Sequence, residues 1–267
     1  MEQHYINSIT SYLEKVCRTR DRWNQEAKSY FVPWFRGQRS AKWGLTPNIF
    51  RLSVDGSEQS IRRTFRRMGV NFALEHMPSD EWAWYFVMQH YKAPTRLLDW
   101  TDGALLALLF AISPATAGEP EVDGDAAVWM LDPWWLNREV LGIDGIIVPD
   151  ANEAQPYLPK LDSEAPLTPT LPIAVAPTYI VRRIAVQRGN FTLFGRDQDG
   201  LTQLGKKRSS HLVKFVIRAS AIDRIRLDLT TSGVCETTVF PDLEGLSREI
   251  VRFWTEPWEQ APGIWQR

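Results

Sequence analysis

The chain has 267 residues, with 31 Lys and Arg against 32 Asp and Glu, and a net charge of −1. This balance excludes a globally polybasic or polyacidic protein, so any contact with nucleic acid or a membrane requires a local patch. An apolar fraction of 44% and a charged fraction of 24% exclude an intrinsically disordered chain.

Cysteine usage and hydropathy give expectations about metal sites and location. Cys17 and Cys235 lie far apart and have no metal-binding spacing beside them, so we expect no metal cofactor. Residues 1–20 lack the apolar stretch of a signal peptide, and the longest apolar segment, 104–112, is too short to cross a bilayer. We therefore expect a cytoplasmic, soluble protein without membrane contact.

The first third of the chain predicts two helices and a strand. Ser8, followed by apolar residues at helical spacing, predicts a capped helix within an N-terminal helical extension, residues 1–30. The aromatic-rich run 30–36 predicts a strand that ends in a turn at Gly37. Apolar residues at helical spacing between 61 and 72 predict a further helix.

Two apolar helices are expected next. An acidic cap around Asp80 predicts a helix that Pro94 terminates. The run 104–112 predicts a buried helix with Thr101 or Asp102 as its cap.

The rest of the chain mixes strands and helices without a regular alternation. Residues 126–131 predict a strand, after which Asp132 and Pro133 begin a short helix. The proline-rich segment 149–178 predicts a long loop. Further strands are expected at 179–186, 190–194 and 213–217, and helices at 220–229 and 243–254. We predict an α+β fold, a single mixed domain with a central, partly antiparallel sheet flanked by helices and a C-terminal tail at 255–267.

Four stretches stand out as candidates for chemistry: 34–38, 89–101, 187–191 and 240–246. At these residues the sequence resembles the FRG domain family of prokaryotes, which is named after a Phe-Arg-Gly motif, here Phe35-Arg36-Gly37. The resemblance implies an FRG domain over 31–254. It also implies a function in conflict systems such as phage defence, where the protein would act as a toxin or another effector.

A looser similarity links the chain to ADP-ribosyltransferases. In that family an early strand ends in Arg, a second strand bears hydroxyl groups before a helix, and a late strand carries a catalytic Glu. Arg36 is similar to the first element and Thr101 to the second, while Gln187 stands where the Glu is expected. The similarity implies a split sheet, with NAD as co-substrate of an ADP-ribosyltransferase or an NAD glycohydrolase. Because a neutral amide gives no charge to a developing cation, slow chemistry, another catalytic group and binding alone all stay open.

The resemblances yield a set of candidate site residues. The candidate catalytic residues are Arg36, His90, Thr101 and Gln187. The candidate NAD-binding residues are Arg36 for the pyrophosphate, Gln38, Thr95, Arg96 and Asp99, with Trp100 or Phe191 against the nicotinamide.

Structural and chemical alternatives accompany these candidates. Arg36 and Asp99 also suit a buried ion pair, and His90 suits the C-terminal end of a helix. Hydrolase chemistry through His90 and Asp99 is a third hypothesis.

A second class of function depends on arginines in the predicted helix near residue 65. Arg62, Arg63, Arg66 and Arg67 lie largely off its apolar stripe and suit contacts to phosphates. The alternative to an enzyme is therefore a non-catalytic interaction module or nucleic-acid-binding module, with a protein or nucleic acid as partner. A simply solvated helix face gives the same pattern.

Overall fold

A mixed sheet runs through the computed structural model of the protein, which describes residues 1–52, 58–72, 77–114, 122–159, 161, 169–177, 189–207, 210–240 and 243–255. Within these ranges the sheet has seven strands in the order β1-β7-β4-β2-β3-β6-β5. The strands are β1 (Glu2–Ile6), β2 (Trp34–Gln38), β3 (Leu97–Thr101), β4 (Ala126–Leu131), β5 (Ile173–Val175), β6 (Gly189–Leu193) and β7 (Leu212–Ile217). β1 is parallel to β7, and all other neighbouring strands are antiparallel. The predicted α+β class is confirmed.

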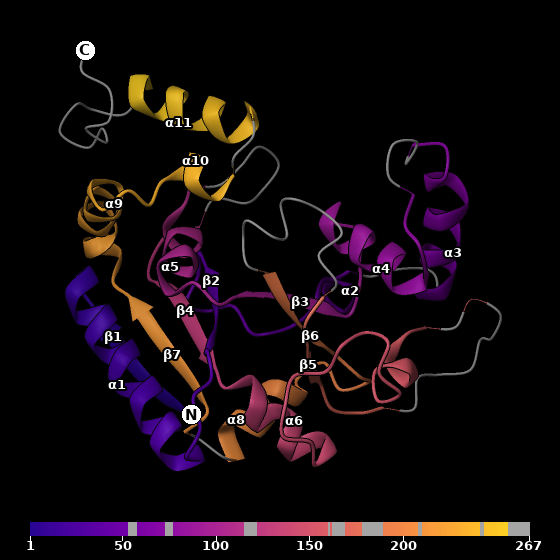
Figure 1. Cartoon of the computed structure of the whole chain (residues 1–267). Coiled ribbons are helices and arrows are strands. Elements are labelled where there is room, and N and C mark those ends of the chain that lie inside the picture. Colours follow the sequence, from indigo (N-terminus) through magenta and orange to yellow (C-terminus); the bar gives the residue numbers. More distant parts are fainter. Residues whose placement is uncertain are drawn as a thin grey trace.

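Four helices pack on one face of the sheet (Figure 1). They are α1 (Ile9–Ala27), α4 (Glu81–His90), α5 (Ala104–Ile112) and α9 (Ile222–Thr231). α1, α5 and α9 share a core with β1, β2, β4 and β7, in which Tyr12 and Phe215 are buried. α4 covers β3, β5 and β6, where Phe86 stacks on Phe191 with ring centroids 5.2 Å apart.

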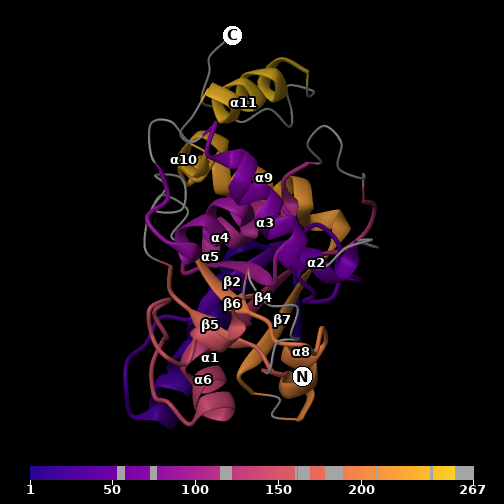
Figure 2. The same cartoon turned by 90° about the vertical axis from the view of Figure 1, so that its right-hand side faces the viewer.

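The opposite face is covered by α6 (Pro133–Leu141) and α8 (Gly200–Lys207), whose apolar side chains pack with Trp34, Leu131 and Leu212. The two views place these helices at one end of the molecule and α10 (Glu236–Val239) with α11 (Leu243–Thr255) at the other (Figures 1 and 2). The remaining described helices are α2 (Asn48–Arg51), α3 (Glu58–Gly69) and the short 3₁₀ turns η1 (Gln155–Tyr157) and η2 (Ala219–Ala221).

Several predicted elements are confirmed together with their caps. The Ser8 hydroxyl accepts a hydrogen bond from the Ser11 backbone N–H at 3.2 Å and begins α1. α5 spans the predicted apolar run, because its apolar side chains are buried in or pack against the core that it shares with the sheet, α1 and α9. Asp132 caps α6 by accepting from the backbone N–H groups of Trp134 and Trp135.

Other predictions are corrected. β2 begins after Pro33 and continues through Gly37, which lies within the strand and not in a turn. The N-cap of α5 is Gly103, whereas Thr101 lies at the end of β3.

The sheet also contains two strands that the sequence did not predict. β1 lies in the predicted N-terminal extension, and β5 lies inside the predicted proline-rich loop. The predicted strand 179–186 falls outside the described residues, and the domain limits at 31 and 254 stay a prediction.

The N-cap of α4 gives a pH-dependent prediction. The Asp80 carboxylate accepts from the Ala83 backbone N–H at 2.8 Å, and this bond lowers the pKa of Asp80 below its usual value. The stabilisation is therefore present above the unfolded-state pKa and is lost as the pH falls through the lower, folded-state pKa. We expect Asp80→Ala to lower the free energy of unfolding by about 1 kcal/mol at neutral pH.

Urea unfolding at neutral pH and at about pH 3 checks this expectation. The difference between wild type and Asp80→Ala should shrink at the acidic pH. Asp80→Asn keeps a hydrogen-bond acceptor at the cap and serves as the control, with a smaller loss at neutral pH. A pH-independent difference for Asp80→Ala would show that the ionised carboxylate contributes nothing.

Candidate functional site

The sheet divides between β2 and β3. These strands share one registered pair, Phe35 with Thr101, whereas β2 and β4 are paired over five residues and β3 and β6 over five. Beyond Phe35 and Thr101 the two strands therefore lack a continuous ladder. We call the opening between them the fork, defined by Arg36 on β2, Asp99 on β3 and Gln89 near the end of α4.

Gly37 allows β2 to lie directly against α5 next to the fork. A Cβ atom at this position would stand 2.1 Å from the carbonyl oxygen of Ala107 and 2.6 Å from the backbone nitrogen of Ala111. The backbones of β2 and α5 approach so closely that only glycine fits. The glycine of the Phe-Arg-Gly motif thus fixes the strand that carries Arg36 against the helix behind it.

Arg36 holds its guanidinium in the fork. Its Nη1 donates to the backbone carbonyl of Asp99 at 2.7 Å and lies 3.7 Å from the Asp99 carboxylate, while its Nε has no hydrogen-bond partner among the described residues. The side chain is 19% exposed. Burial lowers the pKa of Arg36 to about 10; Asp99 opposes this shift and the nearby cation of Arg51 adds to it. The group remains a cation at neutral pH, and its hydrogen-bond and ion-pair partner among the described residues is Asp99.

A chain of hydrogen bonds orients Asp99. The side-chain amide of Gln89 donates to the Asp99 carboxylate at 2.8 Å, and its oxygen accepts from the Thr95 hydroxyl. Thr95 in turn accepts from the backbone N–H of Leu97 at 3.2 Å. Asp99 is 57% exposed, so the oriented carboxylate faces solvent. The fork thus presents a cation and an anion side by side.

The structure brings together three predicted site residues, Arg36, Thr95 and Asp99. It also adds Gln89 and Arg51, which were not among the residues predicted for the NAD site. Gln89 lies next to His90, in one of the stretches that the sequence indicated as candidates for chemistry. Its position just before the turn into β3 could have indicated that it belongs to the site. For Arg51, the sequence gives no signal that it lies near Arg36.

Two predicted ligand-binding residues have structural partners instead. Gln38 is buried, and its amide donates to the carbonyl of Gly44 while its oxygen accepts from Trp129 Nε1 at 2.7 Å. Arg96 pairs with the buried carboxylate of Glu58, so its guanidinium is held by the protein itself.

The predicted aromatic surfaces lie in the core. Trp100 is buried and donates from Nε1 to the Thr192 hydroxyl at 2.9 Å, and the Phe191 ring is buried against Phe86. Neither ring is exposed for stacking on a nicotinamide, which corrects that expectation.

The remaining predicted catalytic residues lie apart or cannot be placed. Thr101 is buried at the closed end of the fork and accepts from the Gly103 backbone N–H at 3.1 Å. His90 ends α4 with its ring edge-on to Tyr91. Gln187 lies outside the described residues.

The arginine face of α3 differs from the sequence expectation. Arg62 is buried and bonded to Glu81 at 2.5 Å and to the carbonyl of Pro159. Arg66 also pairs with Glu81, and Arg63 donates to the carbonyl of Leu161. Arg62 is therefore wrong as an exposed phosphate contact, because α3 lies against α4 and its arginines donate to the carbonyls of Pro159 and Leu161.

A family model of the FRG domain matches residues 32–119. The match covers β2, the helices α2 to α5 and β3, including every residue of the fork. The chain contains an FRG domain. Searches of curated proteins and of solved structures gave no match.

The matched part of the FRG domain supplies both sides of the fork and the glycine contact behind it. Among the described residues, no three His, Cys, Asp or Glu side chains are placed to hold a metal ion. No described helix has both the length and the apolar character that crossing a bilayer requires.

Proposed function

We propose that this FRG-domain protein binds NAD at the fork and acts as an ADP-ribosyltransferase-like enzyme. The observation that carries the proposal is Arg36, a desolvated cation between two diverging strands whose partners among the described residues are the backbone carbonyl of Asp99 and, at 3.7 Å, its carboxylate. An anionic ligand would add to the charge compensation that, among the described residues, the Asp99 carboxylate gives at 3.7 Å. A pyrophosphate suits the forked donors of a guanidinium.

Asp99 supplies a second part of the proposed chemistry. In transfer or hydrolysis, the bond between nicotinamide and ribose C1′ breaks, and nicotinamide leaves with the bonding electrons. The acceptor then bonds to C1′ and releases its proton to solvent. In the proposed complex, the Asp99 carboxylate that Gln89 orients stabilises the developing cation on the ribose.

Calorimetry with NAD tests binding. We expect wild type to bind, and Arg36→Ala to weaken binding by about tenfold to a hundredfold, since a hydrogen bond to a charged group contributes roughly 1.5–3 kcal/mol. Arg224→Ala removes an exposed arginine on α9 and is the matched control, with unchanged affinity expected. Absence of NAD binding by folded wild type, or equal affinity in Arg36→Ala, would refute the proposal.

Release of nicotinamide tests catalysis separately. Asp99→Asn keeps the side-chain shape and should lower the release rate more than it lowers NAD affinity. Labelled NAD incubated with cell protein and nucleic acid would reveal a modified target. A wild-type rate that Asp99→Asn leaves unchanged would remove Asp99 from the chemistry.

An effector function in a prokaryotic conflict system belongs to the same proposal. Expression of wild type in a bacterial host should slow growth or restrict phage, whereas Arg36→Ala should do neither. Equal effects of the two proteins would separate any such function from the fork.

A further inference from the structure

A row of registered side chains crosses the sheet face that α6 and α8 cover in part. Gln3 pairs with Lys214, Lys214 with Trp129, and Trp129 with Arg36. Registered partners in a sheet lie on the same face. Lys214 is on β7, next to the edge strand β1. It is thus two strands from Arg36, roughly 10 Å away at the usual strand spacing.

Lys214 is a partly buried cation that no carboxylate in the described part of the chain pairs with. Its ammonium donates to the carbonyl oxygen of Ala41 at 2.5 Å and lies 4.7 Å from the centre of the Trp129 ring. No described carboxylate lies within ion-pair distance of it, and burial lowers the pKa of Lys214. An ammonium has three N–H donors, so two are left for another acceptor.

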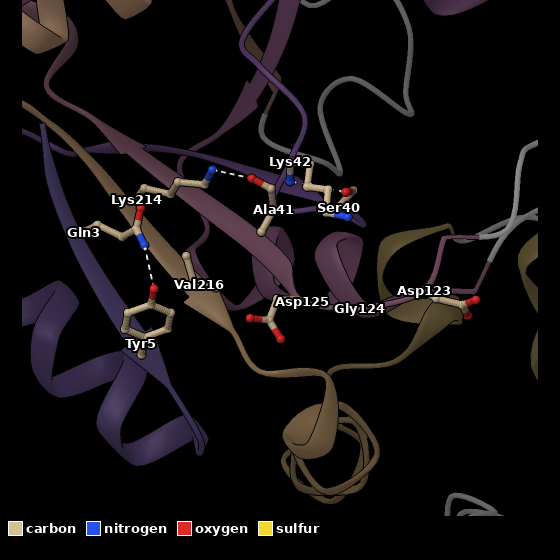
Figure 3. Close-up of a pocket in the computed structure, with 10 residues that line it drawn as sticks. All are labelled: Gln3, Tyr5, Ser40, Ala41, Lys42, Asp123, Gly124, Asp125, Lys214 and Val216. Atoms are coloured by element: carbon tan, nitrogen blue, oxygen red, sulfur yellow. Dashed lines mark hydrogen bonds between the residues drawn. The ribbon is translucent and has the colours of Figure 1, made fainter.

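This ammonium lies at one end of a pocket of about 280 Å³ (Figure 3). β1 and β7 form one wall, and the segments at 40–42 and 123–125 form the other. Its volume is near the lower end of the roughly 300–1,000 Å³ of small-molecule sites. The pocket therefore suits a small ligand.

Two residues that line the same pocket, Ser40 and Tyr5, carry hydroxyl groups. Ser40 is 5% exposed, and its hydroxyl accepts from the Lys42 backbone N–H at 3.2 Å but donates to no described residue. The Tyr5 hydroxyl, on a half-exposed residue, accepts from Gln3 at 3.2 Å, so its proton is available to a ligand or to water. A buried hydroxyl donor without an acceptor is uncommon in folded proteins.

The acidic residues of the pocket lie away from Lys214. Asp125 is occupied by Arg218 at 3.2 Å and by the Ala219 backbone N–H at 2.9 Å. Figure 3 shows Asp123 at the opposite end of the pocket from Lys214. The ammonium of Lys214 and the carboxylate of Asp123 thus lie at opposite ends of the pocket.

We propose that this pocket binds a phosphorylated small molecule with hydroxyl groups. Its phosphate oxygens accept from Lys214 and Ser40, and its hydroxyl groups face Asp123. A phosphate, with several acceptor oxygens, matches donors that come from separate segments better than a flat carboxylate does. The site is separate from the NAD site proposed at the fork.

Binding of inorganic phosphate, ribose 5-phosphate, ribose and acetate tests the proposal. By calorimetry we expect phosphate to bind wild type, ribose 5-phosphate to bind more tightly, and ribose and acetate to bind weakly. Lys214→Met, which keeps an unbranched side chain over Trp129, should weaken phosphate binding by about tenfold. Lys206→Met, at an exposed lysine of α8, is the matched control and should bind as wild type does.

Two further measurements keep the test decisive if Lys214→Met fails to fold. Ser40→Ala should weaken phosphate binding, and phosphate should slow acetylation of Lys214 in wild type without slowing that of Lys206. Equal phosphate affinity in both pocket variants, no protection of Lys214, or acetate binding as tight as phosphate would overturn the proposal. Unchanged NAD affinity in Lys214→Met would show that NAD binding at the fork does not depend on phosphate binding in this pocket, so the two proposals can be tested separately.

Discussion

Replacing Gly37 with alanine should lower the free energy of unfolding by about 3 kcal/mol, at the upper end of the usual cost of overpacking. The added methyl group would overlap the backbone of α5 at Ala107 and Ala111. A backbone contact has no rotamer through which to relax, so β2 and α5 must separate. The core that buries Phe35 would then lose contacts along both elements.

Urea unfolding followed by circular dichroism measures this effect. Gly145→Ala is the matched control, because a Cβ there meets no atom within 4 Å and the residue has no positive φ. We expect its stability to remain within about 0.5 kcal/mol of wild type. If Gly37→Ala were as stable as Gly145→Ala, the close approach of β2 and α5 would be wrong.

Removal of the Glu58 carboxylate should also lower the free energy of unfolding by about 3 kcal/mol, the usual cost of breaking a buried ion pair. Glu58 is buried at the start of α3, where it accepts from Arg96 and from the Tyr85 hydroxyl. Glu58→Ala leaves the Arg96 guanidinium with the carbonyl of Gly195 and the ring of Phe50 as its partners. The uncompensated cation, together with the lost contacts, accounts for the expected loss.

A comparison with an exposed pair isolates the effect of burial. Asp144→Ala removes a carboxylate that pairs with Arg138 on the surface, and its loss should be below about 1 kcal/mol. In a double-mutant cycle, Glu58→Ala and Arg96→Ala should be non-additive by about 1 kcal/mol or more. Additive effects of these two substitutions would refute the coupling.

Local patterns were sufficient for some elements and not for others. The run 104–112 is apolar throughout, and a helix of that length buried on several sides needs no further information. β1 has a polar sequence, and its strand conformation depends on pairing with β7 some 200 residues later. The pattern of residues within β1 does not indicate that β7 is its partner.

The candidate site shows the same division. The Phe-Arg-Gly motif indicated Arg36, and the pairing of Arg36 with Asp99 was one of the predicted alternatives. By contrast, Arg62 appeared exposed because helical spacing describes one helix at a time, whereas Pro159 and Glu81 reach it from other segments. Lys214 carries no motif, and its position follows from strand register alone.

The single registered pair between β2 and β3 bears on how the FRG domain is delimited. The matched region, 32–119, contains these two strands, yet β2 forms its longer ladder with β4 and β3 with β6, both outside that region. A segment cut at residue 119 would leave two outer strand edges with unsatisfied backbone groups. The matched stretch therefore contains the junction between two half-sheets, and the unit that folds must extend beyond it to include β4 and β6.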